Sequence, residues 1–234
     1  MIKLLVSVRN AGEAEEALRG GADWLDIKEP AAGPLGAAGR EVWWQVASVL
    51  EPGVPCSVAL GELIDGQLPL EHIPPLCKFA KVGLARMADL DWSRQWIDVR
   101  RRLPPGTELA AVVYADWRAA GSPPPDAILH VAQQTGTRAV LFDTYGKKYS
   151  IFGCIEPRLL GRWIERVQRA GMLAVLAGSI NQASLGVALA LKPDLIAVRG
   201  AACEGGRLGC VSAARVARLA QLIRSARAAP AVFS

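Results

Sequence analysis

Short, continuously apolar segments recur along the chain, and helix-forming segments separate them. Eight such segments occur in 234 residues, one for about every 29 residues. Continuous apolar runs are typical of parallel strands that are covered on both faces. The pattern therefore restricts the chain to a parallel α/β architecture, with strands predicted at residues 3–8, 24–28, 56–60, 79–84, 108–116, 139–144, 173–179 and 195–200.

Eight strand–helix units match a (β/α)8 TIM barrel, which typically needs about 250 residues. The alternative is a doubly wound open sheet, which usually has fewer strands and a glycine fingerprint after the first one. Here the first turn reads Val8-Arg-Asn-Ala-Gly and contains no such fingerprint. No linker or shift in composition divides the chain. We therefore predict a single-domain barrel over residues 1–234, with its active site at the carboxyl ends of the strands.

Composition narrows the class of protein further. Hydrophobic residues make up 51% of the chain and charged residues 21%, which excludes a disordered protein. No apolar run is long enough to span a membrane, and the start, MIKLLVSV, is too short for a signal peptide, so we expect a cytoplasmic location. Five cysteines without a C-x-x-C pair and only two histidines argue against a zinc site or a disulfide framework.

The net charge of +5 indicates an anionic partner, which could be nucleic acid, an acidic surface or a phosphorylated metabolite. A protein that reads nucleic acid would interleave basic residues with exposed aromatic ones. The basic stretches at residues 100–102 and 215–227 show little of that and are typical of solvated helix faces. The tryptophans are better explained by helix–barrel packing or an oligomer face; those on predicted helices are Trp43, Trp44, Trp92, Trp96 and Trp163.

Charged residues near the ends of apolar strands are informative, because an unpaired charge inside a barrel is costly. Asp26 and Lys28 lie two apart, so both side chains can point into the barrel mouth. Lys81 lies inside the fourth strand, and Asp143 ends the sixth, four residues before Lys147. A desolvated lysine can act as an amine nucleophile, with a carboxylate to orient it or transfer protons. The alternative is a set of structural ion pairs at the rim.

Glycines at the last two strand ends suggest a phosphate site. In barrels, backbone amides after the seventh and eighth strands often hold a phosphate. Gly178 and Ser179 follow the seventh strand, and Gly200 and Ala201 follow the eighth. Glu62 and Asp116 follow the third and fifth strands; they are further candidates, although surface roles suit them equally well.

Most of the chain resembles the (5-formylfuran-3-yl)methyl phosphate synthase family. The matching segments run from Leu4 to Arg207 and include long, unusual strings. They are LLVSV with the acidic helix after it, GGADWLDIKEPAAGPLGA, KFAKVGLA, LFDTYGKK, LAGSI and PDLIAVRGAACEGGR.

The resemblance implies a lyase that joins two molecules of glyceraldehyde 3-phosphate into 4-(hydroxymethyl)-2-furancarboxaldehyde phosphate, with loss of phosphate and water. The product would supply the furan of methanofuran-type one-carbon cofactors, and neither a metal nor an organic cofactor is expected. Carried over residue by residue, the lysine of D-x-K falls on Lys28 and the fourth-strand lysine on Lys81. The Asp-Thr pair falls on Asp143 and Thr144, and the Schiff-base lysine on Lys147.

Two departures from the family pattern affect these assignments. The loop after Thr144 reads Tyr-Gly-Lys-Lys-Tyr in place of a longer polar stretch, so the choice between Lys147 and Lys148 stays open. The first strand ends in Ser7-Val-Arg where Ser-Pro is usual, which puts any role for that strand end in doubt.

Together, the residues and the resemblance give one working hypothesis. Lys147 forms the Schiff base, Lys28 is the acid/base or second amine, and Lys81 gives electrostatic support. Asp26 and Asp143 transfer protons, and the cradle of Gly178, Ser179, Gly200 and Ala201 binds phosphate. We expect a phosphorylated small molecule as partner, no nucleic acid or membrane, and a homo-oligomer. The rivals are another Schiff-base aldolase for triose or deoxyribose phosphates and a non-enzymatic basic binding protein.

Overall fold

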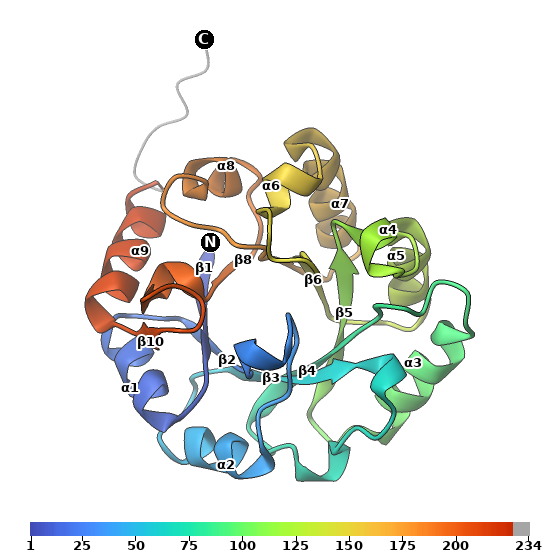
Figure 1. The fold of residues 1–234 in the computed structure, drawn as a ribbon, viewed down its shortest axis with the longest axis horizontal. Helices are drawn as coiled ribbons and strands as arrows, with labels where there is room; N and C mark the ends of the chain where they lie inside the picture. The colour runs from blue at the N-terminus through green and yellow to red at the C-terminus, as the bar shows by residue number, and fades with distance from the viewer. Residues whose placement is uncertain (227–234) are drawn as a thin grey trace.

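The chain folds into a closed barrel of eight parallel strands, in a computed structural model that describes residues 1–226 (Figure 1). Each strand pairs with the next along the chain, and β1 pairs with β8 to close the ring. The predicted TIM-barrel fold is thereby confirmed, while residues 227–234 of the predicted domain lie outside the described residues. The strands are β1 (Lys3–Val8), β2 (Trp24–Ile27), β3 (Cys56–Glu62), β4 (Cys77–Gly83), β5 (Glu108–Tyr114), β6 (Ala139–Asp143), β7 (Leu173–Leu176) and β8 (Leu195–Val198).

Helices surround the barrel on the outside (Figure 1). The connection from β3 to β4 is an exception, because it contains only the short 3-10 turns η2 (Leu63–Asp65) and η3 (Leu70–His72). A third such turn, η1 (Pro30–Ala32), follows β2, and η4 (Gly200–Ala202) follows β8. The helices are α1 (Ala11–Arg19), α2 (Arg40–Ser48), α3 (Trp92–Arg102), α4 (Trp117–Ala120), α5 (Pro125–Gln134), α6 (Ile151–Cys154), α7 (Pro157–Arg169), α8 (Leu185–Ala190) and α9 (Ala213–Ser225).

The last two barrel strands are shorter than the sequence predicts. β7 ends at Leu176 and β8 at Val198, so the residues that follow them form loops at the barrel mouth. The helix predicted from Asn181 begins only at Leu185. The reason is local: the Ser184 amide donates to Asn181 Oδ1 at 3.1 Å, and the Asn181 amide donates to Ser184 Oγ at 3.0 Å. These side-chain bonds hold residues 181–184 in a turn, so the helix begins after them.

The core has two layers, one between the barrel and the helices and one inside the barrel. Trp43 on α2 and Trp96 on α3 are buried in the outer layer, as packing predicts, whereas Trp44 is 52% exposed. Small residues, among them Ala110 and Ala139, line the barrel interior and leave space there. Among residues 1–226, no helix is both long and apolar enough to cross a membrane.

A small hairpin that the sequence did not reveal follows β8. Its strands, β9 (Cys203–Glu204) and β10 (Cys210–Val211), pair antiparallel. Gly209 is required at the turn, since a Cβ there would lie 1.7 Å from the Glu204 carbonyl oxygen. The hairpin lies against α1, and β10 appears beside that helix in Figure 1.

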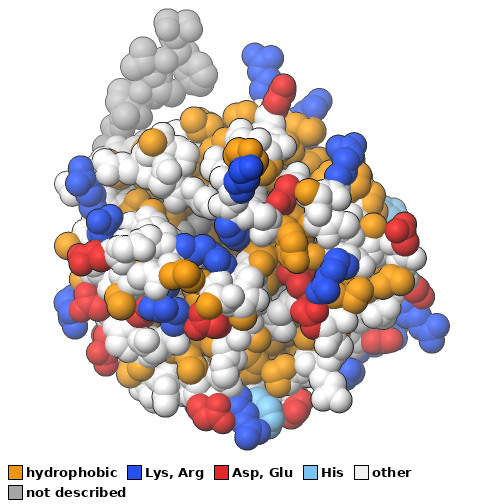
Figure 2. All heavy atoms as spheres, in the orientation of Figure 1, with side chains coloured by type: hydrophobic (Ala, Val, Ile, Leu, Met, Phe, Trp, Pro, Cys, Tyr) orange, Lys and Arg blue, Asp and Glu red, His pale blue; other side chains and the backbone are white. Residues whose placement is uncertain are grey.

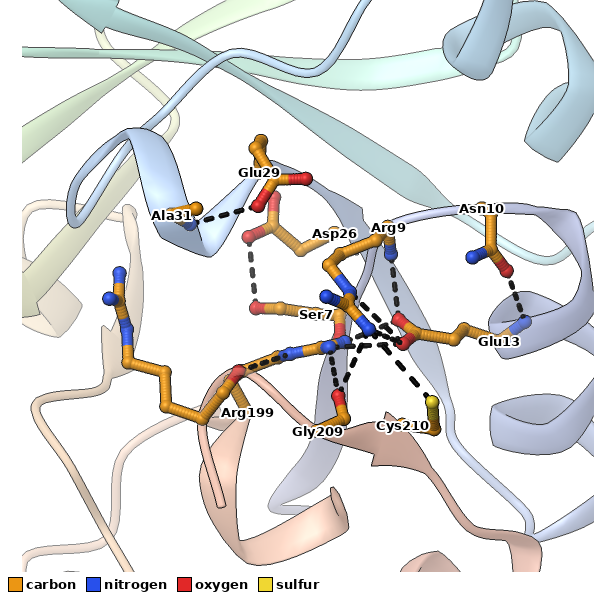
Figure 3. A network of polar contacts seen from close by, with 11 residues as sticks. Ser7, Arg9, Asn10, Glu13, Asp26, Glu29, Ala31, Arg199, Gly209 and Cys210 are labelled. Carbon is orange, nitrogen blue, oxygen red and sulfur yellow. Dashed lines mark hydrogen bonds and ion pairs between the residues drawn. The ribbon is translucent and has the colours of Figure 1, made fainter. Parts of the chain in front are cut away.

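Ionic contacts join the two ends of the barrel ring. The Arg199 guanidinium, just after β8, donates through Nη2 to Glu13 Oε1 on α1 at 3.0 Å and to the Gly209 carbonyl at 2.7 Å (Figure 3). Arg9 contacts the same Glu13 oxygen at 3.1 Å. Glu13 and Arg199 are both buried, and although burial raises the pKa of Glu13, its bonds to the arginines hold that pKa below its ordinary value.

Candidate active site

A cavity of about 270 Å³ opens at the carboxyl ends of the barrel strands. Basic side chains lie near the centre of this face in Figure 2. All nine predicted site residues line this one cavity, although they come from five different strands or the loops that follow them. They are Asp26, Lys28, Lys81, Asp143, Lys147, Gly178, Ser179, Gly200 and Ala201.

Asp26 on β2 is the centre of a buried polar cluster. Its Oδ1 accepts hydrogen bonds from the Lys81 ammonium on β4 and from Ser57 Oγ on β3, the latter at 2.8 Å. Its Oδ2 accepts from Ser7 Oγ on β1 at 3.2 Å. Burial raises the pKa of Asp26, but Lys81 and Lys28 outweigh that effect and keep the pKa below its usual value. Asp26 is therefore an anion whose oxygens are fixed in place.

Lys28 follows directly after β2 and is only 9% exposed. Its Nζ donates to the Pro34 carbonyl at 3.3 Å, and no carboxylate among residues 1–226 forms an ion pair with it. Burial lowers the pKa of Lys28 to about 8, despite the opposing attraction of Asp26 and Asp143; Lys147 and Lys81 lower it further. The uncharged form, which is able to attack a carbonyl, is thus a larger fraction of this amine near neutral pH than of an ordinary lysine.

Lys147 forms a second carboxylate–lysine pair in the loop after β6. Its Nζ lies 2.7 Å from Asp143 Oδ1 and also contacts the carbonyl of Thr144. The Thr144 amide donates to the same Asp143 oxygen at 2.7 Å, so the carboxylate is held from two sides. Lys148 is exposed, outside the cavity, with its Nζ 5.4 Å from the ring centre of Tyr149. The loop geometry therefore brings Lys147 into the site and leaves Lys148 in solvent.

The loops after β7 and β8 present backbone amides to the cavity. Gly178 has φ +92°, and a Cβ there would lie 2.7 Å from Ile151 Cβ, so only glycine fits. Ser179 also has positive φ, +57°, which is strained for a residue with a side chain. Within the described part of the chain, the amides of Ser179, Gly200 and Ala201 have no hydrogen-bond partner. Free amides that line a cavity can bind an anion.

Glu62 and Asp116, the two further candidates after β3 and β5, do not line the cavity and instead hold neighbouring parts of the fold in place. Glu62 is buried, away from the cavity, and accepts from Tyr114 OH at 2.6 Å and the Ala85 amide at 2.9 Å; burial raises its pKa. Asp116 accepts from the amides of Tyr145 and Gly146, both at 2.8 Å. Asp116 thus holds the loop that carries Lys147.

Sequence reasoning missed several residues of the site. Ser7, Ser57, Asn181, Arg199 and Arg207 also line the cavity. The serines gave no signal because small polar residues are common in strands. Arg207 lies inside the VRGAACEGGR string, which identified it as part of a motif without indicating a role.

Within residues 1–226, the cysteines and acidic residues form no cluster that resembles a metal centre. Among the described residues, no group of three or more His, Cys, Asp and Glu side chains is arranged to hold a metal ion. All five cysteines are free, and the sulfurs of Cys56 and Cys77 lie 3.0 Å apart at the amino ends of β3 and β4.

Strands that present buried lysines and carboxylates to one cavity, at the carboxyl end of a (β/α)8 barrel, define a barrel enzyme. The model of the 4-HFC-P synthase family matches residues 4–220. The chain belongs to this family.

Relatives from methanogens match over most of the chain. A (5-formylfuran-3-yl)methyl phosphate synthase of Methanococcus maripaludis is 30% identical over 87% of this chain and 90% of its own length. The protein of the same name from Methanopyrus kandleri is 29% identical over 94% of this chain and 98% of its own.

Solved structures show the same fold at low identity. Phosphoribosyl anthranilate isomerase from Thermus thermophilus is 18% identical, with a TM-score of 0.61, and the match covers 97% of this chain and all of that one. KGPDC from Streptococcus mutans is 12% identical, with a TM-score of 0.60 over 96% of this chain and 99% of its own. These similarities concern the fold alone.

Proposed function

We propose that this enzyme condenses two molecules of glyceraldehyde 3-phosphate into 4-(hydroxymethyl)-2-furancarboxaldehyde phosphate. Family membership and the names of the relatives support the product. The observation that carries the chemistry is a buried amine, Lys28, beside two carboxylate–lysine pairs in one cavity. Atom balance requires the release of one phosphate and two water molecules. The product would serve the synthesis of methanofuran-type cofactors.

Lys28 is a better candidate for the Schiff-base lysine than Lys147, to which the sequence analysis assigned that role. Imine formation needs an uncharged amine, and burial lowers the pKa of Lys28 to about 8. The Lys147 ammonium instead has a counter-ion, because its Nζ lies 2.7 Å from the Asp143 carboxylate. The imine on Lys28 would act as an electron sink, so that loss of an α-proton gives the enamine that attacks the second triose.

The two carboxylate–lysine pairs are suited to the proton transfers. Asp26 with Lys81, and Asp143 with Lys147, are two separate pairs in the cavity that Lys28 also lines. Within each pair, the carboxylate can accept a carbon-bound proton while the ammonium donates one to a departing oxygen. The ammonium groups also stabilise negative charge as it develops.

The amide cradle after β7 and β8 would hold a substrate phosphate. Gly178, Ser179, Gly200 and Ala201 line the cavity close to the lysines, which supports this role. The partner is then a phosphorylated small molecule. The expected cytoplasmic location and homo-oligomer remain part of the proposal; equilibrium sedimentation of the full chain tests the latter.

Borohydride trapping tests the Schiff base. The protein is incubated with glyceraldehyde 3-phosphate and reduced, and the adduct is mapped by peptide mass spectrometry. We expect the adduct on Lys28, and its loss in Lys28→Met but not in the exposed control Lys148→Met. An adduct on Lys147 would restore the initial assignment, and an adduct on neither lysine would refute the Schiff-base mechanism.

Product analysis separates the proposal from its rivals. Mass spectrometry after incubation with glyceraldehyde 3-phosphate should show the furan aldehyde phosphate and free phosphate. A sugar phosphate without a furan would indicate an ordinary aldolase. No turnover, combined with steeply salt-dependent affinity for nucleic acid, would indicate a basic binding protein.

A further inference from the structure

We infer that Arg207 binds the phosphate group of a substrate triose phosphate at the cavity mouth. The inference rests on the proposed function and adds a residue to it. Arg207 lies between β9 and β10, lines the cavity, and is partly buried. Its Nη2 donates to the Gly33 carbonyl at 2.6 Å. Within residues 1–226, its Nη1 and Nε have no hydrogen-bond partner, and no carboxylate forms an ion pair with it.

The nearby Arg199 shows what a structural arginine looks like in this fold. All three nitrogens of its guanidinium donate: Nε to the Arg207 carbonyl, Nη1 to the Ser7 carbonyl and Glu13, and Nη2 to Glu13 and Gly209. Arg199 is therefore fully used in joining β8 to α1. Arg207 comes from the same motif but keeps most of its donors available.

The lysines of the cavity are either paired with a carboxylate or assigned to the proposed reaction. Lys81 is paired with Asp26, and Lys147 with Asp143. Lys28 has no ion pair, but it is the amine proposed to react. Among the described residues that line the cavity, this leaves Arg207 as the cation free to neutralise a phosphate. Burial lowers its pKa, yet a guanidinium remains charged at all physiological pH values.

The position of Arg207 is also right for a phosphate held by the amide cradle. A Cβ placed on Gly200 would lie 3.4 Å from the Arg207 backbone nitrogen, so the two residues are direct neighbours. Its side chain reaches from there to Gly33, in the loop after β2. Arg207 thus spans the mouth between the cradle and the loop beside Lys28. Its free edge can add a charged fork to the neutral amides, an arrangement that suits a phosphate.

Binding of glycerol 3-phosphate tests the inference without turnover, because this ester has no carbonyl to react. Calorimetry should show affinity for glycerol 3-phosphate weakened about tenfold or more in Arg207→Gln, and less in Arg207→Lys, which keeps the charge but loses the fork. The matched control is Arg94→Gln, an exposed arginine on α3. In steady state, the KM for glyceraldehyde 3-phosphate should rise more than kcat falls.

The outcomes distinguish this inference from the proposed function. Affinity of Arg207→Gln within twofold of Arg94→Gln would refute a phosphate-binding role, even in an active enzyme. Phosphate-dependent binding that is lost in Arg207→Gln, in a wild-type protein that makes no furan, would support the site and refute the function. If Arg207→Gln fails to fold by circular dichroism, the comparison rests on Arg207→Lys. A folded Arg207→Lys with unchanged affinity for glycerol 3-phosphate would then count against the guanidinium contact.

Discussion

At the scale of single residues, Lys28, the proposed nucleophile, shows how the burial of a lysine lowers the stability of the fold. Its pKa falls from 10.5 to about 8 in the folded protein, so at neutral pH folding buries a charge that water would solvate better. The lowered pKa corresponds to a loss of about 3 kcal/mol in the free energy of unfolding. It is fully present below pH 8, shrinks between pH 8 and 10.5, and vanishes above both pKa values.

We therefore expect Lys28→Met to be inactive but more stable at pH 7, by up to about 3 kcal/mol in the free energy of unfolding. Urea unfolding at pH 7 and at pH 10.5 measures this, and the gain should be lost at the higher pH. Lys148→Met, at an exposed site, provides the control. If Lys28→Met is less stable than wild type at pH 7, the buried charge of Lys28 does not destabilise the fold as we predict.

The residue scale is also where sequence reasoning succeeds only in part. Charges at strand ends predicted that Asp26, Lys28 and Lys81 would meet, because the ends of parallel strands lie at one edge of a barrel. The pattern did not indicate which lysine is the weaker base, since that depends on burial and on the distances to neighbouring charges. Arg207 could not be placed, because its position depends on a hairpin that returns to the mouth.

At the scale of elements, the loop after β6 depends on a carboxylate from the loop after β5. Asp116 accepts from two consecutive amides, those of Tyr145 and Gly146, directly before Lys147. Without these bonds the loop would lose the conformation that directs Lys147 to Asp143. Asp116 is thus a positioning residue that does not itself line the cavity.

We predict that Asp116→Ala lowers kcat at least tenfold, roughly the effect of losing a charge-assisted hydrogen bond. Asp116→Asn, which keeps one acceptor oxygen, should recover part of the rate. Steady-state kinetics and thermal unfolding are measured on both variants and on Asp126→Ala, an exposed carboxylate paired with Arg166. If Asp116→Ala and Asp126→Ala give equal kcat values, the positioning role is wrong.

Whole elements were predictable where a continuous apolar run was clear, as in β1 and β5. The hairpin of β9 and β10 was not predicted, because its strands are two residues long and the glycines between them resemble a loop. The late start of α8 likewise follows from hydrogen bonds between Asn181 and Ser184, which cannot be predicted from the pattern of apolar residues.

At the scale of the whole molecule, a buried ion pair between Glu13 and Arg199 links the two ends of the ring, beside the pairing of β1 with β8. Removal of one partner from such a pair leaves an uncompensated buried charge, which costs about 3–5 kcal/mol. The pKa of Glu13 is lowered by folding, so its contribution is present above pH 4.5 and is lost as the pH falls through the lower, folded value.

We expect Glu13→Gln to lower the free energy of unfolding by about 3 kcal/mol or more at pH 7, measured by urea unfolding. The difference from wild type should narrow below pH 4.5, where Glu13 becomes protonated in the unfolded chain. Glu165→Gln, which breaks an exposed pair with Arg169, should change stability by less than about 1 kcal/mol. Equal losses in the two variants would show that ring closure does not depend on the buried pair.

The pairing of β1 with β8 also sets the order in which the molecule can be made. Glu13 and Arg199 are 186 positions apart, so a growing chain synthesises Lys28 and Lys81 long before the ring can close. Until β8 emerges from the ribosome, β1 has an unpaired edge, and the loop that carries Gly200 and Arg207 does not exist. The nascent chain therefore holds Lys28, the proposed nucleophile, without the loop that we propose binds the substrate phosphate. Competence arises only when β8 and the loop after it are in place.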